Sequence, residues 1–185
     1  MILYHGTIDK YADSIMNNGI LLKKSKPHLD FGPGFYTTSD KEFAISTAKW
    51  RMRRYNAFHK NDPVKWRVVE LECYEDRIPL LRIKTFEKAD DLWAKFILAN
   101  RSMNPKIKSA FDNNIYACYD VVSGPTADGK NGDLTQIVEA LDSDKIRIEE
   151  IDYSLFAPSA NSSWGHQISF HTEKSLSCIV PRRVI

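Results

Sequence analysis

The sequence predicts one compact domain over residues 1–185 that combines α-helices and β-strands, either α/β or α+β. A chain of 185 residues with 43% hydrophobic residues is long enough to bury one sizeable core, and it shows no repeat, low-complexity segment or linker. Residues 66–74 alternate between apolar and polar side chains, as a half-buried strand does. Residues 88–100 place apolar side chains at the spacing of one helix face.

The N-terminal segment predicts a strand followed by a helix. Residues 2–5 are apolar and aromatic, and Gly6-Thr7 ends this run where a helix cap is expected. Asn17-Asn18-Gly19 then stops a helix whose apolar side chains recur at helical spacing, namely Tyr11, Ile15 and Met16.

A structured loop is predicted from Ser25 to Thr38, because this stretch holds two prolines and two glycines. It leads into a short strand at residues 35–37. Ser39-Asp40 resembles a helix start, and the helix that follows carries an apolar stripe in which we interpret Trp50 as a core residue.

The second half of the chain predicts further strands and helices. In the helix at 88–100 we expect Leu92, Trp93, Phe96 and Ile97 on one face. Loops are expected at 126–133, which could border a site, and at 161–165. The other expected elements are a strand at 78–83, a buried strand at 117–123 ended by Gly124-Pro125, a helix at 134–141, a strand at 167–171 and a turn or strand at 175–179.

Several classes of protein and site are disfavoured by composition. The N-terminus lacks the basic and apolar regions of a secretory signal, and no apolar run approaches the roughly 20 residues that cross a bilayer. We therefore expect a cytoplasmic protein without a membrane partner. Cys73, Cys118 and Cys178 are isolated from one another, so we interpret them as buried or half-buried thiols, and no residue spacing suggests zinc.

The charge distribution leaves two readings open. The net charge of +2 by itself indicates neither nucleic acid nor membrane. Between residues 41 and 67 only Glu42 and Asp62 offset the basic side chains, which could steer a polyanion or form a solvated helix face. The basic residues are Lys41, Lys49, Arg51, Arg53, Arg54, Lys60, Lys65 and Arg67.

Three short motifs are candidate functional segments. Residues 3–7 read LYHGT, residues 30–38 read DFGPGFYTT and residues 167–172 read QISFHT. Each alone has a structural explanation, as a capped turn, a hairpin or the solvent-facing start of a strand. In this order and at this separation, however, their joint occurrence is difficult to attribute to chance.

Together the motifs resemble the ADP-ribosyltransferase superfamily, in particular its diphtheria-toxin-like and poly(ADP-ribose)-polymerase-like branch. They look most like an uncharacterised bacterial family of that clan. Residues 93–101 (WAKFILANR) and 119–128 (YDVVSGPTAD) also look like that family, so the resemblance covers most of the chain. It implies an α+β fold in which split, mostly antiparallel β-sheets with flanking helices surround an NAD cleft.

The resemblance also implies an NAD-binding set. His5 would hydrogen-bond the nicotinamide ribose, the Gly6 backbone would bind the carboxamide, and Tyr36 would stack on the nicotinamide ring, because an aromatic face suits a cationic pyridinium. Gly32 and Gly34 would let the backbone pass close to the ligand. The motif positions Thr7, Phe31 and Phe35 complete this set.

The implied chemistry breaks the bond between nicotinamide and ribose through a state with positive charge on the sugar. His5, Tyr36 and Gln167 would form the catalytic triad. The third position of the family is commonly glutamate, whereas an amide at Gln167 can hold a ribose hydroxyl but supplies no full charge and no general base. Glu173 is a minor alternative, since regular strand geometry turns it away from Gln167. Asp120 and Asp128 could line the cleft or cap turns.

The expected activity is that of a toxin-like mono-ADP-ribosyltransferase that uses NAD as substrate, without a metal. We expect a protein as its macromolecular acceptor, and the basic stretch keeps a nucleic acid acceptor as an alternative. A catalytically inactive NAD-binding or ADP-ribose-binding module is the alternative. A small antitoxin is an expected partner, because an unchecked transferase would harm its own host.

Overall fold

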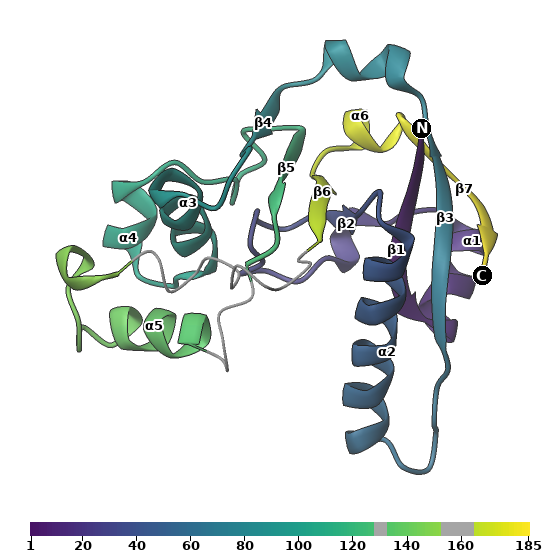
Figure 1. The fold of residues 1–185 in the computed structure, drawn as a ribbon, viewed down its shortest axis with the longest axis horizontal. Coiled ribbons are helices and arrows are strands. Elements are labelled where there is room, and N and C mark those ends of the chain that lie inside the picture. Colours follow the sequence, from purple (N-terminus) through teal and green to yellow (C-terminus); the bar gives the residue numbers. More distant parts are fainter. Residues whose placement is uncertain (128–132, 153–164) are drawn as a thin grey trace.

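The computed structural model describes residues 1–127, 133–152 and 165–185, which form two β-sheets with helices packed around them (Figure 1). The first sheet is antiparallel, with β1 (Ile2–Ile8), β3 (Trp66–Cys73) and β7 (Ile179–Val184) in the order β1-β3-β7. Helices α1 (Asp9–Asn18) and α2 (Lys41–Phe58) pack against it.

The second sheet has the order β2-β6-β5-β4. Its strands are β2 (Phe35–Thr37), β6 (His166–Phe170), β5 (Val121–Pro125) and β4 (Ile83–Thr85), and only the β4–β5 pair is parallel. The remaining helices are α3 (Asp91–Arg101), α4 (Pro105–Ala110), α5 (Asp133–Asp142) and α6 (Glu173–Leu176). The sequence-based prediction of an α+β fold with split, mostly antiparallel sheets is therefore confirmed.

One β-bridge joins the two sheets. The backbone N–H of Tyr4 in β1 donates to the carbonyl oxygen of Thr38 at 2.8 Å, and the N–H of Thr38 donates back to Tyr4 at 3.0 Å. Thr38 directly follows β2. The bridge consequently brings the middle of β1 beside the end of β2, although these strands belong to different sheets.

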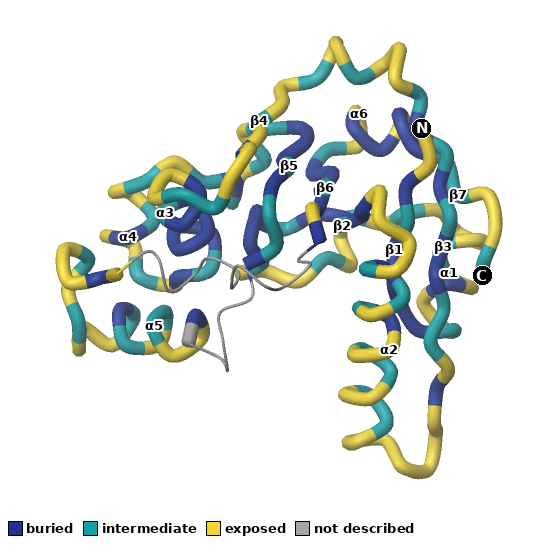
Figure 2. Tube along the Cα trace, viewed as in Figure 1, coloured by how far each residue is buried: buried dark blue, intermediate teal, exposed yellow. Residues whose placement is uncertain are grey.

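Two main hydrophobic clusters stabilise the fold. One is built on Trp93, Phe96 and Phe31 between α3, α5 and one face of the second sheet. The other joins Leu3 and Leu71 of the first sheet to Phe170 on the opposite face of the second sheet. Figure 2 shows the corresponding buried segments along α3 and along the strands.

Several local predictions are confirmed by backbone geometry. Gly19 ends α1 with φ of 73°, a left-handed conformation that glycine adopts without strain. The carboxylate of Asp40 accepts hydrogen bonds from the backbone N–H groups of Glu42 and Phe43 and so caps the start of α2. The strands at 66–74 and 167–171 and the helix at 134–141 also form, with bounds that differ by one or two residues.

Other predicted boundaries are wrong. Strand β1 continues through Gly6 and Thr7, because β3 supplies a pairing partner along its full length. Residues 75–80 form a 3₁₀ helix, and the strand that was expected at 78–83 occupies residues 83–85. The strand expected at 117–123 begins at Val121, since Ala117 has φ of 52° in a turn. Residues 175–179, expected as a turn or strand, contain the end of α6, then a turn at 177–178 and the first residue of β7, so that only the helical part was missed.

Three predicted burials are also wrong. Trp50 is 57% exposed and Leu92 is 72% exposed, because each lies on the outer side of its helix. Cys118 is exposed in the turn before β5, whereas Cys73 and Cys178 are buried as expected. The loop residues 128–132 and 161–164, and with them Asp128, lie outside the described residues.

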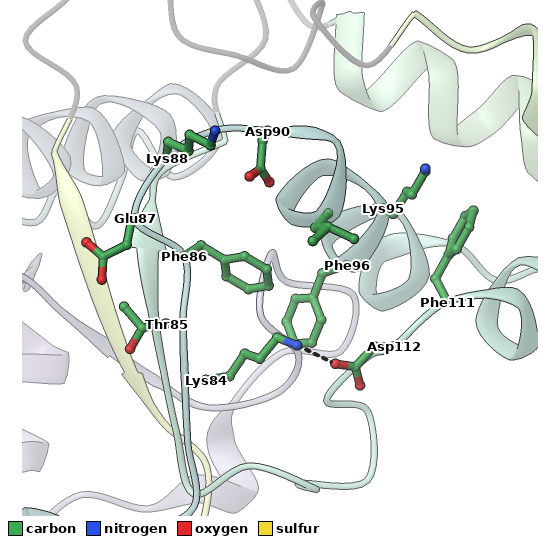
Figure 3. A pocket seen from close by; sticks show the side chains of 11 residues that line it. Lys84, Thr85, Phe86, Glu87, Lys88, Asp90, Lys95, Phe96, Phe111 and Asp112 are labelled. Atoms are coloured by element: carbon green, nitrogen blue, oxygen red, sulfur yellow. Dashed lines mark hydrogen bonds and ion pairs between the residues drawn. The ribbon is translucent and has the colours of Figure 1, made fainter.

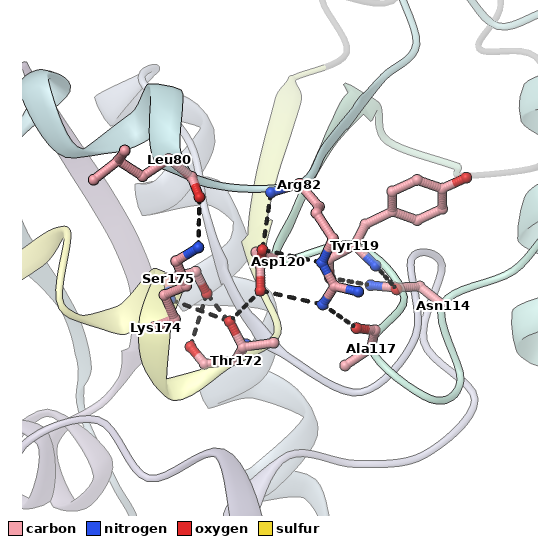
Figure 4. A network of polar contacts seen from close by, with 9 residues as sticks. All are labelled: Leu80, Arg82, Asn114, Ala117, Tyr119, Asp120, Thr172, Lys174 and Ser175. Carbon is pink, nitrogen blue, oxygen red and sulfur yellow. Dashed lines mark hydrogen bonds and ion pairs between the residues drawn. The ribbon is translucent and has the colours of Figure 1, made fainter.

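Asp120 caps turns, which settles one of the alternatives left open by the sequence (Figure 4). Its carboxylate accepts from the backbone N–H of Arg82 at 2.8 Å and from the hydroxyl of Thr172 at 2.7 Å. Burial raises the pKa of this carboxyl, but these hydrogen bonds outweigh burial and keep the pKa below its usual value. Asp120 thus ties the start of β4 to the start of α6. Glu173, at the beginning of α6, is exposed.

No helix among residues 1–127, 133–152 and 165–185 is both long and apolar enough to span a bilayer.

Gly6 is required for the close packing of β1 on α2. A Cβ atom added there would lie 2.1 Å from the backbone oxygen of Ala44, which has no rotamer with which to move away. We expect Gly6→Ala to lower the free energy of unfolding by about 1–3 kcal/mol, as overpacking does. Urea denaturation measures this loss. The matched control Ser46→Ala, on the exposed side of α2, should change stability little, and equal stability of the two variants would contradict the close contact.

Candidate functional site

The three predicted catalytic residues come from three strands at the junction of the sheets. Tyr36 of β2 lies opposite Ser169 of β6. Gln167 is two residues from Ser169, so its side chain projects from the same face of the sheet as that of Tyr36. His5 of β1 follows the bridging residue Tyr4, and its imidazole reaches the backbone of Tyr36. Strand pairing and the bridge thereby bring together three residues that are far apart in the sequence.

His5 is held as a neutral imidazole with a defined tautomer. Its Nδ1 lies 2.6 Å from the carbonyl oxygen of Tyr36, which can only accept, so Nδ1 carries the proton. The ring stacks on Phe35 with centroids 4.4 Å apart. Burial, followed by the positive charge of Arg51, lowers the pKa of His5 from 6.5 to about 3. Nε2 therefore keeps a lone pair that can accept a hydrogen bond.

Gly6 has an unpaired backbone N–H and C=O. Across β3, Val68 exchanges both of its hydrogen bonds with Ile185, so it offers none to Gly6. On the other side, the bridge of Tyr4 to Thr38 does not continue as far as Gly6. Within the part of the chain that the structure describes, Gly6 has no backbone partner. It presents one donor and one acceptor beside His5.

The ring of Tyr36 is fixed at its hydroxyl. This hydroxyl donates to the carbonyl oxygen of Gly32 at 2.7 Å and accepts from the backbone N–H of Phe31 at 2.9 Å. The His171 ring meets the Tyr36 ring edge-on, with centroids 6.3 Å apart. Burial, with a further contribution from Asp30, raises the pKa of Tyr36 well above 10, so the phenol stays protonated. Tyr36 can present a ring face but is not a general base.

Gln167 has a carboxylate partner that the sequence reasoning missed. Its Nε2 donates to Oδ2 of buried Asp30 at 3.1 Å. The other oxygen of Asp30 accepts from Nε of Arg101 at 2.6 Å within an ion pair. Because a carboxylate only accepts, the amide nitrogen must face Asp30, and the amide oxygen of Gln167 has no hydrogen bond from the residues that the structure describes.

The sequence contains both residues of this contact but does not indicate that they meet. Asp30 opens the DFGPGFYTT motif, and Arg101 ends the WAKFILANR segment. Nothing in the sequence, however, pairs these two residues with each other or with Gln167 across 137 positions.

The loop glycines have packing reasons within the protein. A Cβ at Gly34 would lie 2.6 Å from Nδ1 of His171, and one at Gly32 would lie 2.7 Å from the backbone oxygen of Asn114. Gly32 also has φ of 86°, which favours glycine. The Nδ1–H group of His171 donates to the carbonyl oxygen of Pro33 at 2.7 Å. These contacts hold the loop against β6, whatever else it binds.

The other members of the expected NAD-binding set are buried. Phe31 is fully buried in the core, Thr7 is 1% exposed and Phe35 is 8% exposed. In this structure their side chains are packed inside the protein. A direct role in NAD binding stays a prediction.

Arg51 is a second residue that sequence reasoning did not assign to the site. It is half-buried on α2 and close enough to His5 to lower the pKa of that histidine. It has no hydrogen bond or ion pair with any residue that the structure describes. Burial lowers the pKa of its guanidinium, because charge is costly away from water. An unpaired cation of this kind suits an anionic ligand.

Two surface cavities are lined by other residues, and neither contains His5, Tyr36 or Gln167. One of about 440 Å³ lies between β4 and α3, where Phe86 and Phe96 line it and Lys84 pairs with Asp112 at 2.8 Å (Figure 3). The other, of about 300 Å³, is lined by Arg101 and by residues of α5. The described residues form no cluster of three or more histidine, cysteine or acidic side chains that could hold a metal ion.

Comparison with known proteins places the chain in a family. Residues 1–180 match the family described as Protein of unknown function (DUF3990). The chain belongs to DUF3990. No curated protein matches it. The motifs of this DUF3990 protein span nearly the whole matched region, so the site just described lies within the family's shared segment.

Two buried histidines predict how the stability of this DUF3990 protein depends on pH. Burial lowers the pKa of His171 from 6.5 to about 4 and that of His5 to about 3, so the unfolded chain binds more protons between these values and 6.5. Stability is complete above pH 6.5 and falls as the pH drops towards 4, by about 1.4 kcal/mol per pH unit for each histidine.

Urea denaturation from pH 8 to pH 5 measures this dependence. The cost of His5→Gln or His171→Gln should be largest at pH 8 and shrink by about 2 kcal/mol at pH 5, since only the wild type still has to keep that imidazole neutral. A cost that stays constant with pH would contradict neutral burial of the histidine.

The contact between Asp30 and Gln167 predicts a pH-dependent penalty for glutamate at position 167. Gln167→Glu would place two carboxylates where the amide nitrogen now lies 3.1 Å from Asp30. We expect a loss of about 2 kcal/mol in unfolding free energy at pH 8, with a smaller loss at pH 5, where the pair can share a proton.

The double variant Asp30→Asn with Gln167→Glu exchanges donor and acceptor across the same contact. Because Asp30→Asn also removes the ion pair with Arg101, that single variant is measured as well. The double variant should be more stable in thermal and urea unfolding than the sum of the two single losses predicts. Additive losses would show that the contact does not select the amide.

Proposed function

We propose that this DUF3990 protein is an NAD-dependent mono-ADP-ribosyltransferase that releases nicotinamide and modifies a macromolecule. One observation carries the proposal: a neutral histidine with a free Nε2, an unpaired backbone donor and acceptor on the next residue, and a tyrosine ring fixed at its hydroxyl meet at the junction of two sheets. The motif resemblance to ADP-ribosyltransferases implies roles for these same residues: His5 would bind the nicotinamide ribose, Gly6 the carboxamide and Tyr36 the nicotinamide ring.

Gly6 matches the chemistry of the nicotinamide carboxamide. A primary carboxamide offers both N–H donors and a carbonyl acceptor, and the unpaired C=O and N–H of Gly6 are their complements. Tyr36 would stack on the pyridinium ring, and its fixed hydroxyl limits the entropy that binding must remove. A ligand would thereby complete backbone hydrogen bonds that the protein leaves open.

His5 and Arg51 fit the sugar and phosphate parts of NAD. With Nδ1–H donated to Tyr36, Nε2 of His5 would accept a hydrogen bond from a hydroxyl of the nicotinamide ribose. The guanidinium of Arg51 would bind the pyrophosphate, because it is cationic and lacks a partner among the described residues.

Gln167 would act on the reacting sugar through its free oxygen. As the bond from ribose to nicotinamide breaks, its electron pair leaves with nicotinamide and positive charge develops on the ribose. The Gln167 oxygen would hold a ribose hydroxyl, while the charge of Asp30 lies one hydrogen bond behind it. The acceptor nucleophile then bonds to the ribose and loses its proton. Gln167 supplies orientation and a partial negative charge but not a base.

A binding module without turnover is the second candidate, and one observation favours it. The amide of Gln167 cannot take a proton from an acceptor, and Asp30, the carboxylate that hydrogen-bonds to it among the described residues, is already paired with Arg101. The transferase would have a protein or nucleic acid acceptor, whereas the binding module would have an ADP-ribosylated ligand. A neutralising protein partner remains part of the proposal.

Nicotinamide release from labelled NAD tests the transferase proposal. We expect His5→Ala and Tyr36→Ala each to reduce release by about 100-fold, because each removes a contact with the reacting half of NAD. The controls are His59→Ala and Tyr116→Ala, which remove exposed side chains of the same types. Release that is the same in wild type and in both site variants would reject turnover at this site.

Calorimetry with NAD separates the two candidates. Binding that requires Tyr36 but yields no nicotinamide would support the binding module. Absence of both binding and release in the folded wild type would contradict both candidates.

A further inference from the structure

The outer face of α2 is exposed over most of its length, although the Lys49 ammonium lies over the Trp66 ring of β3, 5.4 Å from its centroid. The inner face packs Ala44 and Ala48 against β1 and β3. Figure 1 shows the C-terminal part of α2 and the loop into β3 extending away from the two sheets, and Figure 2 shows exposed residues along this helix. The outer face consists of the exposed residues Ser46, Lys49, Trp50, Arg53, Arg54, Ala57 and Phe58.

All charged residues of this outer face are basic. No aspartate or glutamate occurs from Phe43 to Asn61. Lys49 and Arg53 lie about one helical turn apart on the exposed side, and Arg54 directly follows Arg53. None of the three forms an ion pair with a residue that the structure describes. Solvated surface helices usually mix charges of both signs, so an unneutralised row of three cations indicates an anionic partner.

Two large aromatic rings interrupt the basic row. Trp50 is 57% exposed and Phe58 is 81% exposed. The guanidinium of Arg54 lies over the Trp50 ring, 5.4 Å from its centroid, which restrains the indole in an outward position. Exposing such rings to water is unfavourable without a partner, and a purely electrostatic contact with an acidic peptide would not require them.

We propose that the outer face of α2 binds single-stranded nucleic acid. Phosphates would contact the cations, and unstacked bases would lie on the Trp50 and Phe58 rings. The two rings are eight residues apart, about 12 Å along the helix axis. This spacing exceeds the roughly 3.4 Å rise per nucleotide of a stacked strand, so the rings can reach separate bases only where stacking is interrupted.

The inference deepens the proposed function by naming the acceptor class, and to that extent it rests on it. The inner face of the same helix covers β1, which carries His5 and Gly6, and Arg51 extends from α2 towards His5. A strand held along α2 would therefore lie on the element that adjoins the candidate NAD site. Binding to α2 itself does not require NAD.

Fluorescence anisotropy with labelled single-stranded RNA and DNA of mixed sequence tests the proposal on the full-length protein. With about three phosphate contacts, binding should weaken by about 20-fold between about 50 and 200 mM salt. Trp50→Ala should weaken binding by about 10-fold, whereas Trp50→Phe, which keeps a stacking ring, should retain it. Arg53→Glu with Arg54→Glu should weaken binding at least as much and reduce the salt dependence.

The matched control is Lys23→Glu with Lys24→Glu, a pair of exposed cations in the turn at Leu22–Lys24. It reverses the same charge elsewhere on the surface and should leave affinity within about two-fold. Circular dichroism verifies that each variant is folded.

Three results would each overturn the proposal: an equal loss in the control pair, unchanged binding by Trp50→Ala, or equal binding of polyglutamate. The first and third would indicate non-specific attraction, and the third would favour an acidic protein partner. Nicotinamide release by the Arg53 and Arg54 variants is measured in parallel. Release without nucleic acid binding would refute only the acceptor, and binding without release would refute only the transferase.

Discussion

Two backbone hydrogen bonds between Tyr4 and Thr38 are the constraint on which the candidate site depends. They bring β1 of one sheet beside the end of β2 of the other, so that the His5 imidazole can donate to the Tyr36 carbonyl. The bridge is also limited to one residue pair, which leaves the N–H and C=O of Gly6 without a backbone partner among the residues that the structure describes. Because α2 presses directly on Gly6, no side chain can fill this position. The same local geometry thus creates both a rigid histidine and an open pair of hydrogen-bonding groups.

The negative charge next to position 167 lies on Asp30, which contacts Gln167, and not on residue 167 itself. The motif resemblance implies an acid where this chain has Gln167, and here the Gln167 amide donates a hydrogen bond to the charged carboxylate of Asp30. Arg101 balances that charge, so an additional carboxylate at position 167 would face repulsion from Asp30 rather than attraction from Arg101 alone. The neighbouring Asp30 therefore favours an amide at position 167. The amide cannot act as an acid or base, but its hydrogen bond to Asp30 fixes its orientation.

The fold was predictable where a local rule decides the structure. Alternation gave β3, the cap at Asp40 gave the start of α2, and Gly19 gave the end of α1. Prediction failed where a partner distant in sequence decides it. Pairing with β3 extends β1 through Gly6 despite the low strand propensity of glycine. Helical spacing placed Trp50 in an apolar stripe, but only the position of β1 determines which side of α2 is buried, and Trp50 lies on the other side.

The sequence by itself determined the family motifs, the α+β class and the identity of His5, Tyr36 and Gln167 as candidates. Each of these depends on residue types in a fixed local order. Tertiary structure alone decided that the His5 imidazole is neutral and that Gly6 lacks a backbone partner within the described part of the chain. It also decided that Asp30 and Arg101 adjoin Gln167 and that α2 presents a basic and aromatic face. Protonation, hydrogen-bond pairing and exposure are set by what other segments bring within a few ångströms, and no local pattern records those neighbours.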